Sequence, residues 1–241
     1  MNLKVIGTGS RGNAYLLENE EEALLIECGV NIKAIKQAIK FNIKKIKACI
    51  VTHEHGDHAK SIKEVMALGI DIYSSLKTFE ALGIKNHRAK EIHGVALTLG
   101  NFKVKAFDVE HDAADPSGFL IAHPETGNIL FLTDTVYSPY TFRGLNNIII
   151  EANYDGEIAK RKLSDMEFLR NRIIQSHMSI DTCIDFLKSN DITAVNNIVL
   201  IHLSDSNSHE KAFQYRVAKA TGKNVTVAYN GLEMEFNKTP F

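Results

Sequence analysis

Residues 47–58 read KACIVTHEHGDH. The apolar first half of this stretch predicts a buried strand, which leads directly into histidines and acidic residues. His53 and His55 are two positions apart, so on an extended strand exit they project to the same side. Asp57 and His58 begin the helix that is predicted next, and they can face back toward the first two histidines. Rigid scaffolds place catalytic ligands in loops of this kind, directly after strands.

The side chains of this motif are of the kinds that bind metal ions. Imidazole nitrogen and carboxylate oxygen suit Zn²⁺, Mn²⁺ or Fe, and neutral imidazole, the ligand form, is available at pH 7. Structural zinc sites usually contain cysteine, but Cys28, Cys49 and Cys183 lie outside the motif. The motif also offers more ligands than one ion needs. The sequence therefore predicts an open catalytic site or a two-metal site.

Predicted strands and helices alternate along both halves of the chain, without a linker or an internal repeat. We expect one domain, residues 1–241, of the α/β (α+β) class, with two sheets flanked by helices. Helices are predicted from Asn31 and at Ala59–Leu68, Glu157–Arg172, Ile180–Lys188 and His209–Thr221. Strands are predicted at Leu3–Ile6, Ala14–Leu17, Ala23–Ile26, Lys47–Thr52, Ile70–Tyr73, Val95–Leu99, Phe102–Val109, Gly118–Ala122, Ile129–Leu132, Ile148–Ile150, Asn197–Ile201, Val225–Tyr229 and Leu232–Phe236.

The amino-acid composition excludes several classes of protein. The 241 residues are 44% hydrophobic and 24% charged, which excludes disorder as the main state. The net charge of -1 gives no global basic field, so bulk electrostatic capture of nucleic acid is not implied. Three cysteines without CxxC spacing predict buried thiols rather than disulfides. No apolar run approaches a membrane span, and the first residues lack the pattern of a signal peptide. We expect a cytoplasmic protein with no membrane partner.

The motif HEHGDH after an apolar strand resembles the signature of the metallo-β-lactamase superfamily. Other stretches resemble one branch of it, the YycJ/WalJ-like group related to RNase Z and RNase J. They are GTGSRGNAYLL (7–17), LLIECG (24–29, with Glu27 in place of the branch's aspartate), FDVEHDAADPSG (107–118), FLTDT (131–135), EANYD (151–155) and VLIHLS (199–204). The resemblance covers nearly the whole chain. It implies a four-layer αββα sandwich with a two-metal hydrolase site.

Carried over position by position, the resemblance implies a complete ligand set. His53, His55 and His111 would hold one metal ion. The other ion would be held by Asp57, His58 and His202, with Asp134 bridging the two. His111, Asp134 and His202 each follow a predicted strand, so these ligands can converge on one rim of the sandwich. The implied cofactors are two divalent ions per chain, with Zn or Mn ahead of Fe.

The resemblance also implies roles in catalysis. Asp57 would accept a hydrogen bond from a hydroxide generated on the metals and orient it. His177, in the sequence SHMS, is the candidate proton donor or phosphate contact. It resembles a motif of RNase Z-like relatives, although this chain has HMSI where the branch more often has HLSN. Substrate contacts are predicted for His177 and for Ser204 and Asn207, which follow the last ligand motif.

The predicted function is a two-metal phosphodiesterase or nuclease, with DNA favoured over RNA and 5′ exonuclease activity as one form. Hydrolysis of a small ester, thioester or lactone on the same metals is the first alternative, and an apolar substrate pocket would favour it. A non-catalytic metal-binding regulatory protein is the second alternative. The oligomeric state is left open, with a dimer as one alternative.

Overall fold

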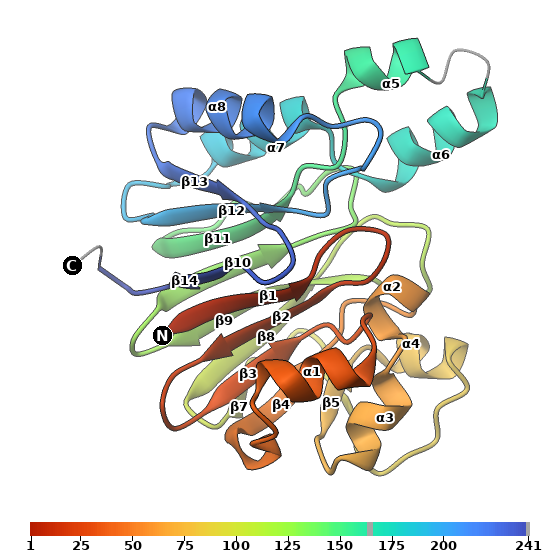
Figure 1. Cartoon of the computed structure of the whole chain (residues 1–241), viewed down its shortest axis with the longest axis vertical. Coiled ribbons are helices and arrows are strands. Elements are labelled where there is room, and N and C mark those ends of the chain that lie inside the picture. The colour runs from red at the N-terminus through yellow and green to blue at the C-terminus, as the bar shows by residue number, and fades with distance from the viewer. Residues whose placement is uncertain (163–165, 240–241) are drawn as a thin grey trace.

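The computed structural model describes residues 1–162 and 166–239. Two seven-stranded sheets lie face to face in the middle of the molecule (Figure 1). The first sheet contains, in spatial order, β14 (Glu233–Glu235), β1 (Asn2–Gly7), β2 (Ala14–Glu18), β3 (Ala23–Ile26), β4 (Ile46–Ile50), β5 (Ile72–Ser74) and β6 (Ala89–Glu91). The second contains β13 (Asn224–Val227), β12 (Asn197–Ile201), β11 (Leu145–Glu151), β10 (Gly127–Leu132), β9 (Ser117–His123), β8 (Phe102–Asp108) and β7 (Leu97–Leu99).

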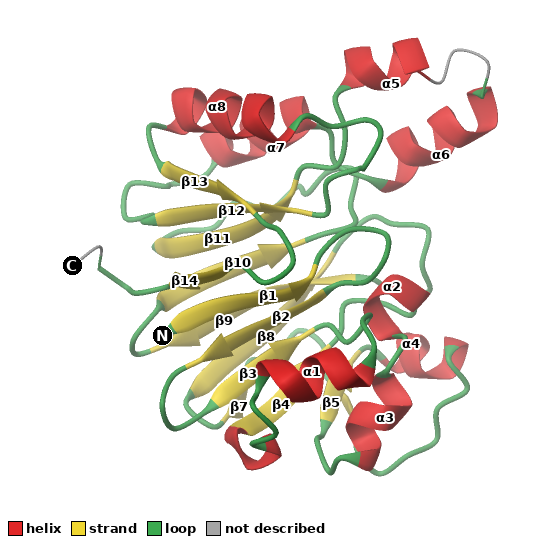
Figure 2. Ribbon diagram, viewed as in Figure 1, coloured by secondary structure: helices red, strands yellow, loops and turns green. Residues whose placement is uncertain are grey.

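Helices cover the outer face of each sheet (Figure 2). The first sheet is accompanied by α1 (Ile32–Ala38), the 3₁₀ turn η1 (Ile43–Lys45), α2 (Gly56–Ala59), α3 (Ile62–Ala67) and α4 (Leu76–Ala81). The second is accompanied by α5 (Gly156–Lys162), α6 (Glu167–Ser176), α7 (Ile180–Ser189) and α8 (Glu210–Thr221). The predicted αββα sandwich is therefore confirmed. Among the described residues, no helix is both long and apolar enough to cross a membrane.

The main core lies between the two sheets. Tyr15 on β2 and Phe131 on β10 are fully buried there and meet edge to face, with ring centroids 5.5 Å apart. The strands from β3 to β6 pair in parallel, as do those from β10 to β13. Because parallel strands have helices on one side and the core on the other, they read as continuous apolar runs. Their carboxyl ends meet at one edge of each sheet.

One predicted helix is interrupted in the structure, so that prediction was wrong. The helix expected over Ala59–Leu68 is two short helices, α2 and α3. The backbone N–H of Ser61 donates to the carbonyl of Cys28 at 2.9 Å, while the carbonyl of Asp57 accepts from the N–H of Asn13 at 2.7 Å. These long-range bonds replace the bond that would have joined position 57 to 61 within one helix. The break lets the motif bond to the first sheet's loops.

The helix expected over Glu157–Arg172 is likewise two helices, α5 and α6. Part of that prediction, residues 163–165, lies outside the described residues. The short elements α4 and β6 were not predicted. Most other elements agree within one or two residues at each end, and the strand at Asn197–Ile201 has the predicted bounds. All three cysteines are free and buried, as expected.

Candidate metal centre

The predicted ligand residues lie at strand ends along one edge of the sandwich. The motif at 53–58 follows β4, and its last residues form α2. From the second sheet, His111 follows β8, Asp134 follows β10 and His202 follows β12. Since β10 and β12 both pair in parallel with β11, their carboxyl ends meet at the same edge. The structure brings together all seven predicted side chains: His53, His55, Asp57, His58, His111, Asp134 and His202.

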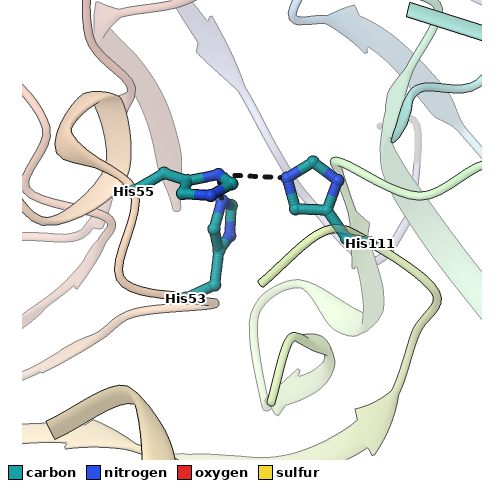
Figure 3. Close-up of side chains that lie close together, drawn as sticks. All are labelled: His53, His55 and His111. Atoms are coloured by element: carbon teal, nitrogen blue, oxygen red, sulfur yellow. Dashed lines mark hydrogen bonds between the residues drawn. The ribbon is translucent and has the colours of Figure 1, made fainter. Parts of the chain in front are cut away.

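Three histidines form the first cluster (Figure 3). His53 and His55 extend from the loop after β4, and His111 faces them from the second sheet. His53 Nε2 lies 3.0 Å from His55 Nδ1, and His111 Nε2 lies 3.2 Å from the same His55 nitrogen. Three imidazole nitrogens turned toward one point are a ligand set that a Zn²⁺-like cation favours.

The second cluster combines carboxylates with imidazoles. His202 Nε2 lies 3.3 Å from Asp57 Oδ2, and His58 Nε2 lies 3.5 Å from the same oxygen. Asp134 connects this cluster to the first one. Its Oδ2 lies 3.1 Å from His58 Nε2, and its Oδ1 lies 4.0 Å from His111 Nε2. Asp134 is therefore where a bridging carboxylate would be needed.

The protonation states of these groups fit divalent cations. Burial lowers the pKa of both His53 and His111, so their rings are neutral and free to act as ligands. Burial alone would also lower the pKa of His202, but the charge of Asp134 and the hydrogen bond to Asp57 raise it to about 10. The charge of Asp134 raises the pKa of His58 in the same way, against its burial. Two buried imidazoles thus carry protons that balance carboxylates, and a bound metal ion can replace such protons.

A buried carboxylate behind the first cluster orients its rings. Glu27 is fully buried, and its Oε1 accepts a hydrogen bond from Thr52 Oγ1 at 2.6 Å. Because the Thr52 hydroxyl hydrogen is donated to Glu27, Thr52 Oγ1 accepts a hydrogen bond from His53 Nδ1 at 2.9 Å. This bond directs His53 Nε2 into the cluster. The same Glu27 oxygen lies 3.4 Å from His58 Nδ1. The glutamate that replaces the branch's aspartate therefore lies beside His58 of the second cluster and acts on His53 of the first through Thr52.

Other ligand side chains have fixed partners as well. His111 Nδ1 lies 2.8 Å from the carbonyl of Ser176, so it donates there and leaves Nε2 free. Asn153 Nδ2 lies 3.1 Å from His202 Nδ1 and donates to the His202 carbonyl at 2.8 Å. Such outer contacts determine which imidazole nitrogen is available to a metal ion.

Three of these residues have strained backbones. Glu27, Asp134 and His202 have φ angles of 62°, 48° and 54°. Residues other than glycine rarely adopt this left-handed backbone conformation, which costs roughly 1–2 kcal/mol. Glu27 and His202 directly follow β3 and β12, and Asp134 lies two residues after the end of β10. Three of the five described non-glycine residues with positive φ thus belong to the site, and the other two, Lys40 and Phe41, follow α1.

An acid–base pair of a half-buried histidine and a buried glutamate lies beside the second cluster. His177 Nδ1 is 2.7 Å from Glu151 Oε1 and 3.3 Å from Asp134 Oδ1. Burial would lower the pKa of His177, but the charge of Glu151 outweighs it and raises the pKa. The predicted proton donor is therefore at the site and holds a proton more firmly than a free imidazole does. Glu151 itself was not predicted as a site residue, although an acidic residue ending the apolar run NIIIE is the signal that would have found it.

The centre opens into a cavity of about 270 Å³. Its lining residues are Ser10, His55, Asp57, His111, Asp112, Asp134, Arg172, Ile173, Ser176, His177 and His202. Ser10 belongs to the glycine-rich turn at 7–12. Ile173 is the one apolar side chain that the described residues contribute to this lining. The cavity therefore suits a charged, polar substrate.

A family model described as "Metallo-beta-lactamase superfamily" matches residues 7–174. The chain belongs to the metallo-β-lactamase superfamily. It is a hydrolase of this fold, with buried histidine and aspartate clusters of the kind that hold divalent metal ions. The resemblance inferred from the motifs is confirmed.

Two curated relatives have similar sequences across most of the chain. An exodeoxyribonuclease YycJ from Bacillus anthracis is 31% identical over 238 residues, covering 88% of this chain and 86% of the relative. An exodeoxyribonuclease WalJ from Streptococcus pneumoniae is 31% identical over 193 residues, covering 69% of this chain and 71% of the relative. Both names belong to the branch of the superfamily whose motifs are similar to those of this chain.

Solved structures share the fold at lower identity. The metallo-β-lactamase fold protein YhfI from Bacillus subtilis superimposes with a TM-score of 0.72 at 17% identity, covering 97% of this chain and 99% of that one. The short form of human tRNase Z superimposes with a TM-score of 0.65 at 18% identity, covering 98% and 99%. These likenesses establish the architecture of this superfamily member and not its substrate.

Two predicted substrate contacts lie away from the cavity of this metallo-β-lactamase fold. Asn207 is buried and donates through Nδ2 to Ser204 Oγ at 3.3 Å. Its backbone N–H donates to the same oxygen at 3.2 Å. Neither residue is among those that line the cavity. In this structure they hold the turn after His202, and a direct contact with substrate stays a prediction.

Proposed function

We propose that this chain hydrolyses phosphodiester bonds of DNA and removes nucleotides from a 5′ end. The observation that carries the proposal is the cavity lining, which combines the ligand clusters with Arg172 and His177 and includes a single apolar side chain. A pocket for a small ester or lactone would be lined mainly by apolar side chains, with few charged ones. The names of both curated relatives, exodeoxyribonucleases, support DNA as the polymer.

We assign one cation to His53, His55 and His111 and a second to Asp57, His58 and His202, with Asp134 between them. Divalent cations bound there would lower the pKa of a water molecule and would polarise a phosphoryl oxygen. The chain's own groups supply the remaining functions. Asp57 lines the cavity, where its carboxylate accepts a hydrogen bond from the attacking water and orients it.

Departure of the leaving alcohol requires a proton. His177 lines the cavity, and the charge and hydrogen bond of Glu151 raise the pKa of the ring, which favours its protonated form. Donation from the opposite ring nitrogen, Nε2, to the leaving oxygen returns the ring to its neutral form while Glu151 holds the Nδ1 proton. General acid catalysis of this kind contributes about 10²- to 10⁴-fold.

The test uses 5′-phosphorylated, end-labelled DNA, single- and double-stranded, with RNA of the same sequence. Wild type is compared with Asp57→Ala and with Asp185→Ala, an exposed aspartate on α7 that serves as the matched control. With Mn²⁺ or Zn²⁺ added, we expect DNA loss that disappears only in Asp57→Ala. The product ladder gives the direction of cleavage. Intact DNA after incubation with a protein that holds two metal ions per chain would overturn the proposal.

A second comparison isolates the proton donor. His177→Gln should lose about 10²-fold or more on DNA, whose leaving alkoxide needs a proton. On a p-nitrophenyl ester of thymidine 5′-phosphate the leaving group needs no proton, so the same variant should lose little. Equal losses on both substrates would contradict the donor role and leave the nuclease proposal intact.

A further inference from the structure

A second, larger cavity adjoins the site. It has a volume of about 820 Å³ and shares His111, Asp112, Arg172 and Ser176 with the site cavity. Its other walls are Glu110, Val136, Phe168, Asn171 and Gln175. These residues come from the loops after β8 and β10 and from α6, which extends beyond the sandwich at the end where α2 lies (Figure 1). The shared residues make the two cavities one continuous depression.

One face of α6 forms the wall of this outer cavity. Phe168, Asn171, Arg172 and Gln175 are spaced at i, i+3, i+4 and i+7, which places them on the same side of the helix. A helix face that packs against a core would carry aliphatic residues at these positions. This one carries an aromatic ring, two carboxamides and a guanidinium. All four side chains are exposed, and they offer a ring for stacking and polar groups for hydrogen bonds to a ligand.

Phe168 is the aromatic residue of this face, and it lies in the wall of the outer cavity. Its side chain is 85% exposed, although an exposed phenylalanine contributes nothing to the core. It lies one helical turn before Arg172, which lines both cavities. A large exposed aromatic beside a proposed catalytic cavity is typical of a site where a flat ligand stacks.

The charges in the outer cavity select the part of a nucleotide that it can accept. Glu110 and Asp112 give the wall two carboxylates, against the single guanidinium of Arg172, which lies 3.8 Å from Asp112 through Nε. A row of phosphates would be repelled there. A neutral nucleobase would instead meet a ring to stack on, with the amides of Asn171 and Gln175 available to its edge.

We propose that the outer cavity binds the nucleobase next to the scissile phosphodiester, stacked on Phe168, with Arg172 on the phosphate that joins it to the site. This inference rests on the proposed nuclease function. It assigns single-stranded DNA ends to the cavity, because a base must leave its pair to stack on a side chain.

The test measures kcat/KM on a single-stranded oligonucleotide and on a series in which one nucleotide at a time lacks its base. Phe168→Ala should lower kcat/KM on the intact strand about tenfold or more. Phe168→Trp should retain the wild-type value. Tyr215→Ala, which removes a 65% exposed ring on α8, is the matched control and should have no effect. Melting curves verify that each variant is folded.

The abasic series separates stacking from a general disturbance of α6. One abasic position should lower wild-type kcat/KM as much as Phe168→Ala does, and combining the two should cost no more. If wild type degrades DNA and Phe168→Ala degrades it equally well, or if the two losses multiply, the nucleobase site is wrong and the nuclease function stands. If metal-loaded wild type degrades no DNA, both proposals fall together.

Discussion

A glycine outside the histidine motif controls where the motif lies. A Cβ atom added at Gly29 would lie 1.7 Å from the carbonyl oxygen of Asp57 and 2.1 Å from its carbonyl carbon. Real Cβ contacts essentially never fall under 3.0 Å, so Gly29→Ala must separate these backbones by at least about 1.3 Å. The Asp57 carbonyl is also held by the N–H of Asn13 at 2.7 Å, so the displacement extends into that loop.

The size of this displacement sets the expected effect. Metal-ligand distances tolerate only about 0.2 Å, and a misplacement of 1 Å can cost about 10²-fold in rate. Gly29→Ala should therefore lower metal occupancy and reduce kcat/KM about 100-fold, with a loss of about 1–3 kcal/mol in stability from overpacking.

The matched control lies inside the motif itself. A Cβ at Gly56 meets nothing within 4 Å, so Gly56→Ala should keep wild-type metal content and activity. Metal stoichiometry by mass spectrometry, kcat/KM and thermal melting would be measured for both variants. Full metal content and activity in Gly29→Ala would refute the packing argument, as would a severe loss in Gly56→Ala.

Three further changes test other parts of the structure. Glu27→Gln should weaken metal binding about 10- to 100-fold while the fold persists, and unchanged affinity in a chelator competition would contradict its orienting role. Burial would raise the pKa of Glu18, but hydrogen bonds and charges of Lys4 and Lys45 lower it below 4.5. The ion pairs of Glu18 therefore stabilise the fold above that pH, and this stabilisation is lost as the pH falls through the lowered pKa. Glu18→Gln should destabilise the protein at pH 7 by an amount that shrinks in acid, as urea melts at pH 7 and pH 3 would show. Phe131→Ala should cost about 3–5 kcal/mol in urea unfolding, and a loss below 1 kcal/mol would place the ring outside the main core.

Local patterns were sufficient to predict much of the site. The motif at 53–58 carries four candidate ligands within one loop, so no long-range contact is needed to bring them near each other. The family resemblance implied Asp134 and His202 as ligands, and their places after apolar runs agree with it, because both runs pair in parallel with β11 and so end at the same edge. A pattern that marks a strand end therefore also predicts where its next side chain lies.

These local sequence patterns do not predict contacts between segments that are distant in the chain. The break after α2 depends on Asn13 and Cys28, which lie more than 30 residues before the helix that they interrupt. The end of the apolar run before Glu151 marks it as a candidate, but its contact with His177 is seen only once β11 places the two side by side. The face of α6 that lines the outer cavity carries no aliphatic stripe, so hydropathy gave no reason to assign it to a binding surface.

The left-handed backbones at Asp134 and His202 have a consequence for protein engineering. Glycine at either position would relieve roughly 1–2 kcal/mol of strain, and it would remove a candidate ligand at the same time. Strain of this kind is often retained where the side chain serves the activity. A library evolved for heat resistance alone should therefore drift toward glycine at these two positions, whereas a library that must also retain activity should preserve both original side chains.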